Sequence, residues 1–483
     1  MGELSNLLKK YLNEKHKSIL HLAKACSMDR STAYKILKGT RNPSSMDQIR
    51  RMSAFLQLTP REEEKMIEAY EIDRDGRVSV YRRKEVEKFL REPFIRISQD
   101  FELPAHVEDS LKTVRMLNNE FEVNSAVYDA ILSAAQKGQG KIAVFATDAD
   151  ESFSVFIRSL QHTYPDLQID YILMINYDSY EYMHEDSGYL NLAKLKCTLQ
   201  IVGNTNTRVY YQYGTVNSGM NEVPYFTNAV ITSDTVVMLK NGHAKALCIQ
   251  DPDIAREYQK MFEETKDNSK ELFAFANSIE IMFHYLTDLS FHNIRARLIY
   301  EMAPCLFHSV TEQLLQEKTI QEVPERDTLI QKILAYVEVN GEVIRSGKVP
   351  MIHCFEGYRD FMESGLLRDL PSHMYTPLTM KERIELLERY IDSIGDTDLH
   401  VLKKAIGPIQ NGLYVFLYDQ ELMFQFLNSE GRLILMALNE FTFYDAFEDY
   451  LKALIQKTEL FYTKEELTEK LNALLNEYKE KYV

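Results

Sequence analysis

The sequence predicts a multidomain protein with an all-α head followed by an α/β body. Three observations lead to this prediction. The chain has 483 residues, which exceeds the usual size of one domain. Its first 58 residues carry apolar residues at helical spacing between cap residues. Beyond about residue 107, strand-length apolar runs alternate with helical segments, and one such arrangement occurs twice.

The head is best defined by Ser18–Pro43, which has the pattern of a helix-turn-helix. We expect Ser18 and Asp29 to cap two short helices, because their side-chain oxygens accept backbone N–H groups that a helix start leaves unpaired. The second helix covers Arg30–Lys38 and ends at Gly39, since glycine readily adopts the left-handed backbone conformation. A short, polar, basic helix presented in this way fits the major groove of DNA.

Over about residues 4–58, this pattern resembles the DNA-binding domain of Xre/Cro-type phage and bacterial repressors. The matching residues are Leu22-Ala23, Met28-Asp29-Arg30-Ser31-Thr32, Ile36, Gly39-Thr40-Arg41-Asn42-Pro43, Ile49 and Phe55-Leu56. Ile19 and Leu37 depart from the family pattern, which often has Gln and Glu at these places. The resemblance implies that the head binds double-stranded DNA. The residues implied to contact DNA are Ser18, Arg30, Ser31, Thr32, Tyr34, Lys35, Lys38, Thr40, Arg41 and Asn42.

Within this set, the five residues from Arg30 to Lys35 are expected near base edges, where Arg or Lys can hydrogen-bond guanine. The four residues from Lys38 to Asn42 are expected at phosphates. The charge distribution agrees, because residues 1–58 hold eleven Lys and Arg and four acidic residues, a balance of +7. The whole chain carries −16, so the remainder carries −23. A basic head on an acidic body suits DNA binding, since phosphate contacts supply most nonspecific affinity.

Residues 59–106 are expected to form a helical linker. Thr59-Pro60-Arg61-Glu62 is a helix start with a Thr cap, and Tyr81–Leu90 is a second, basic helical stretch. The basic residues Arg82, Arg83 and Lys84 either form a solvated helix face or contact a DNA backbone.

The body begins with helices expected at 107–118 and 125–137, followed by a β-α-β unit. Its strands cover 141–147 and 169–175, with a helix at 152–164 between them. Further strands are expected at 196–202, 207–213, 226–232, 235–240, 245–250, 413–418 and 433–438, and further helices at 253–266, 268–287, 327–336, 355–364, 380–393, 443–457 and 464–479.

An internal repeat links residues 228–266 to residues 412–457. Both segments read strand, Asp turn, strand, Asn/Gly turn, strand and capped helix. Two such halves resemble the phospholipase D-like fold, in which two similar α/β lobes pack together. The resemblance implies lobe 1 at 107–290 and lobe 2, with C-terminal helices, at 291–483.

Members of that family carry His-x-Lys-x4-Asp once per lobe, for nucleophilic attack and phosphate binding. Aligning the repeat places Asp234 at the Asp position, with Thr227 and Ala229 at the His and Lys positions. In the second half Asp419 aligns, with Gly412 and Tyr414 at those positions. The segment His243-Ala-Lys245 is a near match, but Gln250 stands where Asp is required. We therefore expect no catalytic residues.

No cofactor or metal is expected either. The five cysteines lie far apart without a CxxC pair, and the histidines do not pair with Cys or Glu at ligand spacing. Gly341 to Val349 fails the P-loop pattern, because the spacing is too long and Val349 replaces Ser or Thr. Tyr210, Tyr211, Tyr213 and Tyr225 either line a ligand pocket or form a half-buried sheet face. No apolar run reaches membrane-span length, so we expect a cytoplasmic protein.

These features favour a sequence-specific transcriptional regulator of bacterial or phage origin. Its non-catalytic body would form a homodimer and sense a small-molecule or protein effector. Dimerisation is expected because one small motif rarely binds DNA tightly enough alone. Two alternatives remain open. One is an antitoxin-like or defence-system controller whose body binds a protein partner. The other is a phosphodiesterase, a phospholipase D-like nuclease or lipase, that the head tethers to DNA.

Overall fold

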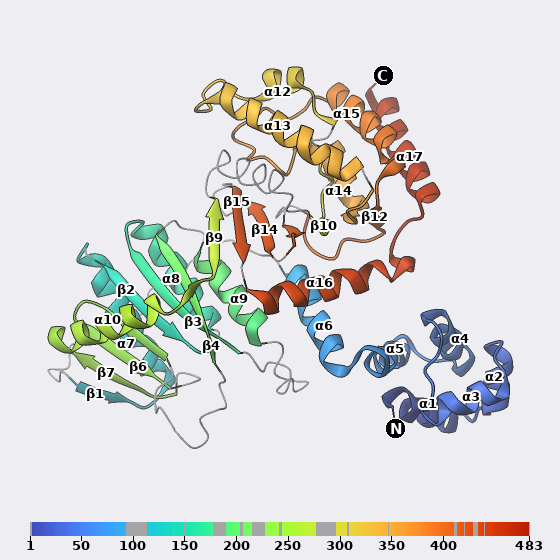
Figure 1. Ribbon diagram of the computed structural model, residues 1–483, viewed down its shortest axis with the longest axis horizontal. Helices are drawn as coiled ribbons and strands as arrows, with labels where there is room; N and C mark the ends of the chain where they lie inside the picture. The colour runs from blue at the N-terminus through green and yellow to red at the C-terminus, as the bar shows by residue number, and fades with distance from the viewer. Residues whose placement is uncertain are drawn as a thin grey trace. The chain divides into compact units, whose positions relative to one another are not determined.

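The chain divides into two units in the computed structural model, a head up to Glu85 and a body from Val86 on (Figure 1). The boundary falls inside helix α6 (Arg77–Arg91). The structure describes residues 2–92, 114–138, 140–148, 150–176, 190–202, 206–214, 228–240, 244–276, 296–306, 309–345, 347–409, 413–419, 421–427, 433–438 and 440–482.

The described part of the head is helical. Its helices before α6 are α1 (Glu3–Glu14), α2 (Ile19–Ala25), α3 (Arg30–Leu37), α4 (Met46–Leu56) and α5 (Pro60–Asp75). Leu22 of α2, Ile36 of α3 and Ile49 of α4 meet in one apolar core. Met66 of α5 belongs to the same core, so this helix packs as part of the head, although it lies within the expected linker 59–106.

The predicted helix caps are confirmed. The Ser18 hydroxyl accepts a hydrogen bond from the His21 N–H at 3.3 Å, and the Asp29 carboxylate accepts one from the Thr32 N–H at 2.8 Å. Thr59 and Glu62 form a reciprocal capping box at the start of α5. Because each cap is an interaction between residues three apart, the local sequence determines it.

The body contains two sheets, and the first has the strand order β1-β7-β6-β5-β2-β3-β4-β8. Its strands are β1 (Val114–Leu117), β2 (Lys141–Ala146), β3 (Gln168–Asn176), β4 (Thr207–Gly214), β5 (Asn228–Ile231), β6 (Thr235–Leu239), β7 (Ala246–Gln250) and β8 (Lys270–Glu271). The pairs β2–β3 and β3–β4 are parallel, and the other neighbours are antiparallel.

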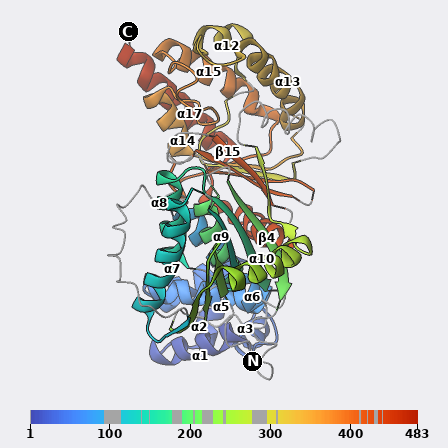
Figure 2. The same ribbon diagram turned by 90° about the vertical axis from the view of Figure 1, so that its left-hand side faces the viewer.

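Helices cover both faces of this sheet. They are α7 (Glu120–Gln136), α8 (Glu151–Thr163), α9 (Leu190–Ile201) and α10 (Pro252–Asp267). Ala255 and Phe262 of α10 pack against Ala143 and Ile172 of the sheet. Figure 2 shows α7 and α8 on the opposite side from α10. Strands buried on both faces agree with the nearly continuous apolar runs of β2 and β3.

The second sheet has the order β12-β11-β10-β13-β14-β15-β9. Its strands are β9 (Phe273–Ala276), β10 (Leu298–Glu301), β11 (Met351–Cys354), β12 (Leu399–Leu402), β13 (Tyr414–Leu417), β14 (Leu422–Leu427) and β15 (Leu433–Leu438). The pairs β10–β11 and β11–β12 are parallel. The accompanying α-helices are α12 (Glu312–Lys318), α13 (Arg326–Arg345), α14 (Phe355–Ser364), α15 (Met380–Ser393), α16 (Phe441–Ile455) and α17 (Lys464–Tyr482).

The two sheets repeat one topology. Reading from β4 to β1 gives β4-β3-β2-β5-β6-β7-β1, and β12-β11-β10-β13-β14-β15-β9 has the same arrangement of parallel and antiparallel neighbours. We therefore call residues 114–267 lobe 1 and residues 273–482 lobe 2. Lobe 2 begins at β9, ahead of residue 291 where the sequence placed its start, because β9 pairs with β15.

Three expectations about local structure are wrong. Residues 196–202 lie mostly in helix α9, because Leu192, Leu195 and Leu199 have helical spacing that outweighs the short alternation from Cys197. The expected helix 107–118 ends instead in strand β1, which pairs with β7. The segment 268–287, expected to be a helix, contains β8 and β9, because β8 pairs with the edge of β4 and β9 pairs with the edge of β15.

Within the body, the C-terminal part of α6 packs against β14 and α16. The ring of Phe89 lies 5.9 Å from that of Phe424 and 5.5 Å from that of Phe447, measured between centroids. In the described ranges we find no helix with the length and apolar character needed to cross a lipid bilayer.

Candidate functional site

The carboxyl ends of the parallel strands are the first place to look for a site. In open α/β sheets, ligands bind outside this edge, near the point where the strand order reverses. That point lies between β2 and β5 in lobe 1 and between β10 and β13 in lobe 2. In each lobe, the residue that the sequence alignment put at the lysine position of the motif falls there. Ala229 is in β5 opposite Phe145, and Tyr414 begins β13 opposite Glu301.

In lobe 1 this edge carries a cluster of polar side chains, which we call the lysine cluster: Asp148, Asn176, Asn191, Lys194 and Asn228. Asn228, the first residue of β5, donates from Nδ2 to Asp148 Oδ1 at 2.7 Å. Its Oδ1 accepts from the backbone N–H of Thr147 at 2.7 Å. The residue beside motif position Ala229 is therefore fixed to the loop that follows β2.

Lys194 extends from α9 to the end of β3. Its Nζ donates to the Met174 carbonyl at 2.7 Å and lies 3.5 Å from Asn176 Oδ1. Asn191, one turn earlier, hydrogen-bonds both backbone groups of Asn176. Only 2% of Lys194 is exposed. Burial lowers the pKa of Lys194 to about 8, and the charge of Asp148 opposes this change.

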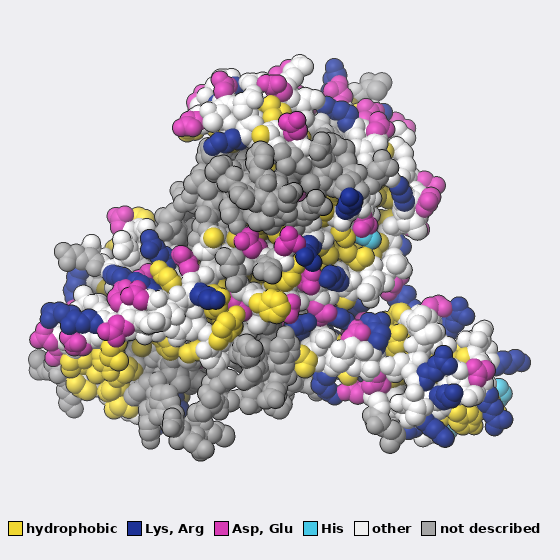
Figure 3. Space-filling view, in the orientation of Figure 1, with side chains coloured by type: hydrophobic (Ala, Val, Ile, Leu, Met, Phe, Trp, Pro, Cys, Tyr) yellow, Lys and Arg dark blue, Asp and Glu magenta, His cyan; other side chains and the backbone are white. Residues whose placement is uncertain are grey.

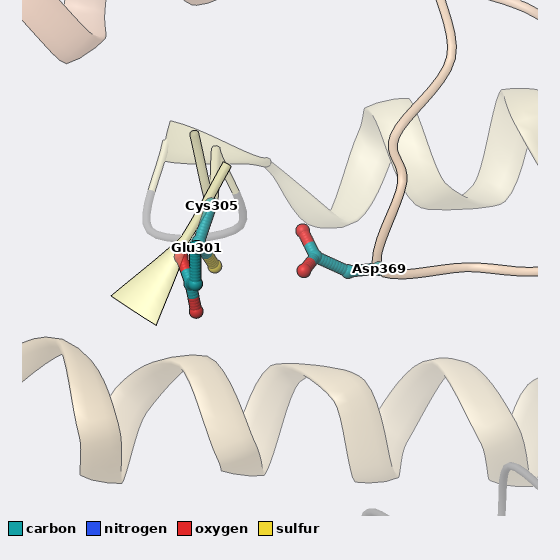
Figure 4. A group of neighbouring side chains, drawn as sticks. All are labelled: Glu301, Cys305 and Asp369. Atoms are coloured by element: carbon teal, nitrogen blue, oxygen red, sulfur yellow. The ribbon is translucent and has the colours of Figure 1, made fainter. Parts of the chain in front are cut away.

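In lobe 2 the corresponding edge carries buried acidic groups. Figure 4 shows Glu301 at the end of β10, Cys305 shortly after it, and Asp369 pointing toward both from another segment. The exposed fractions are 4% for Glu301, 8% for Cys305 and 7% for Asp369. One donor atom from each lies within 4.8 Å of the others. We call these three residues the acid–thiol cluster.

His353 of β11 lies beside the acid–thiol cluster, with its Nε2 3.5 Å from Glu301 Oε2. Its Nδ1 is 3.0 Å from the Tyr358 hydroxyl and 3.3 Å from the Tyr390 hydroxyl. Burial lowers the pKa of His353 to about 3 and raises that of Glu301 to about 8. Burial, and then the Glu301 carboxyl, raise the pKa of Asp369 well above its ordinary value.

The other motif residues are held by structural interactions. Asp234, in the turn between β5 and β6, accepts from Lys137 Nζ at 2.5 Å and from the Thr235 hydroxyl at 3.0 Å. Asp419, after β13, accepts from Arg297 Nε at 2.8 Å. Thr227, Gly412, His243 and Tyr225 lie outside the described residues. Of the strand tyrosines, Tyr213 donates to the buried Glu440 carboxylate at 2.7 Å.

In the head, most of the predicted DNA-contacting side chains lie at the surface. Lys and Arg side chains are visible on the head in Figure 3. Ser31, Lys35 and Lys38 are exposed, and the Arg30 guanidinium stacks over the Tyr34 ring at 5.6 Å. Ala33 of α3, in contrast, is buried, with only 1% of it exposed.

Some of the predicted contact residues already have partners within the head. The Thr32 hydroxyl donates to Asp29 at 2.6 Å, and Arg41 reaches Thr32 at 3.4 Å. The Thr40 N–H donates to the Lys35 carbonyl at 2.9 Å. Asn42 donates to the Asp73 carbonyl at 3.1 Å, which ties the end of the motif to α5.

The three basic residues of α6 that were considered for contact with a DNA backbone, Arg82, Arg83 and Lys84, are paired or largely buried. Arg83 pairs with Asp75 at 2.5 Å, Lys84 pairs with Glu68 at 2.6 Å, and Arg82 is only 9% exposed. This arrangement agrees with a structural role for them.

No family model matches the chain, and no curated protein matches it, so neither comparison supports the helix-turn-helix family assignment of the head. Solved structures do match. Polyphosphate kinase from Porphyromonas gingivalis has 8% identity and a TM-score of 0.22, over 67% of this chain and 47% of that chain. The alignment thus spans about half of that protein.

Phosphatidylserine synthase from Haemophilus influenzae Rd KW20 has 12% identity and a TM-score of 0.23, over 76% of this chain and 92% of that chain. NucT from Helicobacter pylori has 13% identity and a TM-score of 0.21, over 33% and 98%. These structural neighbours are phospholipase D-like, as the sequence predicted for the body. At such identities the likeness concerns the fold alone, and the residues of a site must come from this chain.

The expectations of a non-catalytic regulator and of a protein without enzyme activity are contradicted by these matches, which include a polyphosphate kinase and a phosphatidylserine synthase. They rested on the missing His and Lys of the motif. That reasoning overlooked the lysine cluster and the acid–thiol cluster, which other elements bring to the same sheet edges. Lys194 lies just before the segment 196–202 that was taken for a strand, and no helix was expected there. No sequence pattern links Glu301 with Asp369, because only the packing of lobe 2 brings the two residues together.

Proposed function

We propose that this chain is a DNA-tethered phosphodiesterase, with its phosphodiester site at the lysine cluster of lobe 1. One observation carries the proposal. A buried ammonium group, that of Lys194, lies at the carboxyl edge of the parallel strands, where the phospholipase D-like motif would otherwise supply a lysine. Ala229 occupies the motif position and has no such group.

The position of Lys194 suits phosphate recognition. A phosphodiester carries a negative charge that grows on its oxygens in the transition state, and a fixed cation in a water-poor site stabilises it strongly. Lys194 is held by the Met174 carbonyl, and Asn228 connects the neighbouring strand β5 to Asp148. Asn176, Asn191 and Asn228 add amide groups that can donate to phosphate oxygens after rearrangement.

Because Thr227 replaces the motif histidine, we propose direct attack by water. The water oxygen forms a bond to phosphorus, and the bond from phosphorus to the leaving oxygen breaks. Asp148 takes a proton from the water. Lys194, whose pKa of about 8 keeps it protonated at neutral pH, gives a proton to the leaving oxygen. The products are a phosphomonoester and an alcohol.

The test is turnover of bis(p-nitrophenyl) phosphate and of a duplex oligonucleotide. Lys194→Met should lower turnover by roughly 10²–10³-fold, the usual cost of removing a fixed charge-stabilising donor. Lys196→Met is the matched control, because Lys196 lies on the same helix but pairs with Glu92. It should keep full activity. Equal turnover in the Lys194 variant and the wild type would rule out this site, and no turnover in the wild type would rule out the function.

For the head, we propose sequence-specific binding of duplex DNA through α3, by a dimer that reads two half-sites. The exposed basic residues Arg30 and Lys35 support this proposal. Arg30→Ala with Lys35→Ala should abolish gel shifts of a selected duplex, while Arg61→Ala with Lys65→Ala on α5 should leave them unchanged. Undiminished affinity in the first double variant would refute the assignment. A monomeric mass on DNA would refute the dimer.

A further inference from the structure

We propose that lobe 2 binds one Zn²⁺ ion at the acid–thiol cluster, with Glu301, Cys305 and Asp369 as ligands and His353 as the fourth. This site is separate from the lysine cluster, which lies in lobe 1. Nothing in the proposed phosphodiester chemistry requires it.

The distances are those of a near-complete site. The Cys305 Sγ, a Glu301 oxygen and an Asp369 oxygen lie within 4.8 Å of one another. Ligand atoms of a tetrahedral zinc ion, with bonds of about 2.0–2.3 Å, are separated by about 3.5 Å. Small side-chain rotations therefore bring the three atoms to bonding distance around a common centre.

The donor types select the metal. Two carboxylates, a thiolate and an imidazole form a mixed oxygen, sulfur and nitrogen set, which suits Zn²⁺. Mg²⁺ and Ca²⁺ prefer oxygen ligands alone, so Cys305 argues against them. A divalent cation also removes the cost of enclosing three acidic groups that are each more than nine-tenths buried.

Independent evidence comes from His353, which is 1% exposed and lies outside the three-residue cluster. Its Nε2 has no hydrogen-bond partner among the described residues, yet it lies 3.5 Å from Glu301 Oε2. Its Nδ1 faces the Tyr358 hydroxyl at 3.0 Å. A histidine that binds metal typically donates its other ring N–H to such a partner, and this leaves a lone pair on the metal side.

Two buried carboxylate oxygens also favour a cation at this cluster. Within the described ranges, Glu301 Oε2 and Asp369 Oδ2 have no hydrogen-bond donor. Buried polar atoms are normally paired, so several unpaired atoms around one point call for an explanation. A bound cation would satisfy both carboxylate oxygens and the imidazole together.

The experiment uses the full chain, stripped with a chelator, equilibrated with Zn²⁺ and dialysed. Metal content is measured by plasma mass spectrometry. We expect about one zinc per chain and a higher melting temperature with zinc, because a ligand that binds only the folded state stabilises it. Cys305→Ser and the isosteric Asp369→Asn should both lose the zinc. Cys248→Ser, which alters an equally buried cysteine in lobe 1, should keep it.

Circular dichroism distinguishes loss of the site from loss of the fold, and Asp369→Asn, which preserves side-chain volume, provides the second variant. Substitution with Co²⁺ gives an additional readout, since a thiolate ligand produces a charge-transfer band. Cys305→Ser should remove this band, and Cys248→Ser should keep it. A wild type without zinc would overturn the proposal. So would a folded Cys305→Ser or Asp369→Asn variant with undiminished zinc, or equal binding of Mg²⁺ by the wild type.

Discussion

The buried charge of Lys194 should make the stability of the body depend on pH in a way that one substitution removes. Burial lowers the pKa of this lysine from 10.5 to about 8. Between those values the unfolded chain binds more protons than the folded chain, so the free energy of unfolding rises with pH. Above pH 10.5 the amine is neutral in both states, and below pH 8 it is charged in both.

The size of the effect follows from the difference between the two pKa values. At about 1.4 kcal/mol per pKa unit, burying this charge costs about 3 kcal/mol at pH 7. Lys194→Met keeps an unbranched chain of similar length but has no charge to bury. After allowance for the lost hydrogen bond to the Met174 carbonyl, we expect this variant to be about 1–2 kcal/mol more stable than the wild type at pH 7.

The assay is urea unfolding at pH 7 and at pH 10, followed by circular dichroism, for the wild type, Lys194→Met and Lys196→Met. From pH 7 to pH 10, the free energy of unfolding of the wild type and of Lys196→Met should rise by about 2–3 kcal/mol more than that of Lys194→Met. The same pH dependence in all three proteins would show that Lys194 is not buried as a charged group. It would also remove the physical basis for placing a phosphodiester there.

Two further perturbations test the packing of each unit. Asp29→Ala removes the cap of α3 and should cost the head about 1 kcal/mol, measured by its unfolding midpoint. Asp47→Ala, at an exposed position of α4, should cost less than half of that, and equal losses would contradict the capping role. Phe89→Ala removes a buried ring that contacts Phe424 and Phe447. In denaturant unfolding, this variant should lower the stability of the body by about 3–5 kcal/mol. A loss below about 1 kcal/mol would contradict this packing.

Much of the fold could be predicted where neighbouring residues determine it. The caps Ser18 and Asp29 act within one helical turn, and the repeated strand–turn–strand arrangement of β5–β7 and β13–β15 joins adjacent segments. Strands β10, β11 and β12 were not predicted. They are only four residues long; β10 and β11 are fully buried and β12 is buried over its last two residues, so none of them shows alternation.

The candidate sites were beyond the reach of local patterns. Lys194 immediately precedes a segment whose apolar alternation at Cys197 and Leu199 resembles that of a strand, and only helix α9 brings its ammonium group to β3. Glu301 and Asp369 come from segments far apart in the chain, and the packing of lobe 2 brings them together. The structure places Ala229 and Tyr414, which the alignment put at the lysine position of the motif, at the carboxyl edge of the parallel strands, although neither side chain can replace a lysine.

The most direct test of the central claim is phosphodiester turnover measured as a function of pH for the wild type and Lys194→Met. We predict turnover by the wild type that declines as pH rises through about 8, because Lys194 then loses its proton, and a loss of roughly 10²-fold or more in the variant at pH 7. Wild-type protein with no turnover at any pH, or a Lys194→Met variant with the same rate and the same pH profile, would contradict the account.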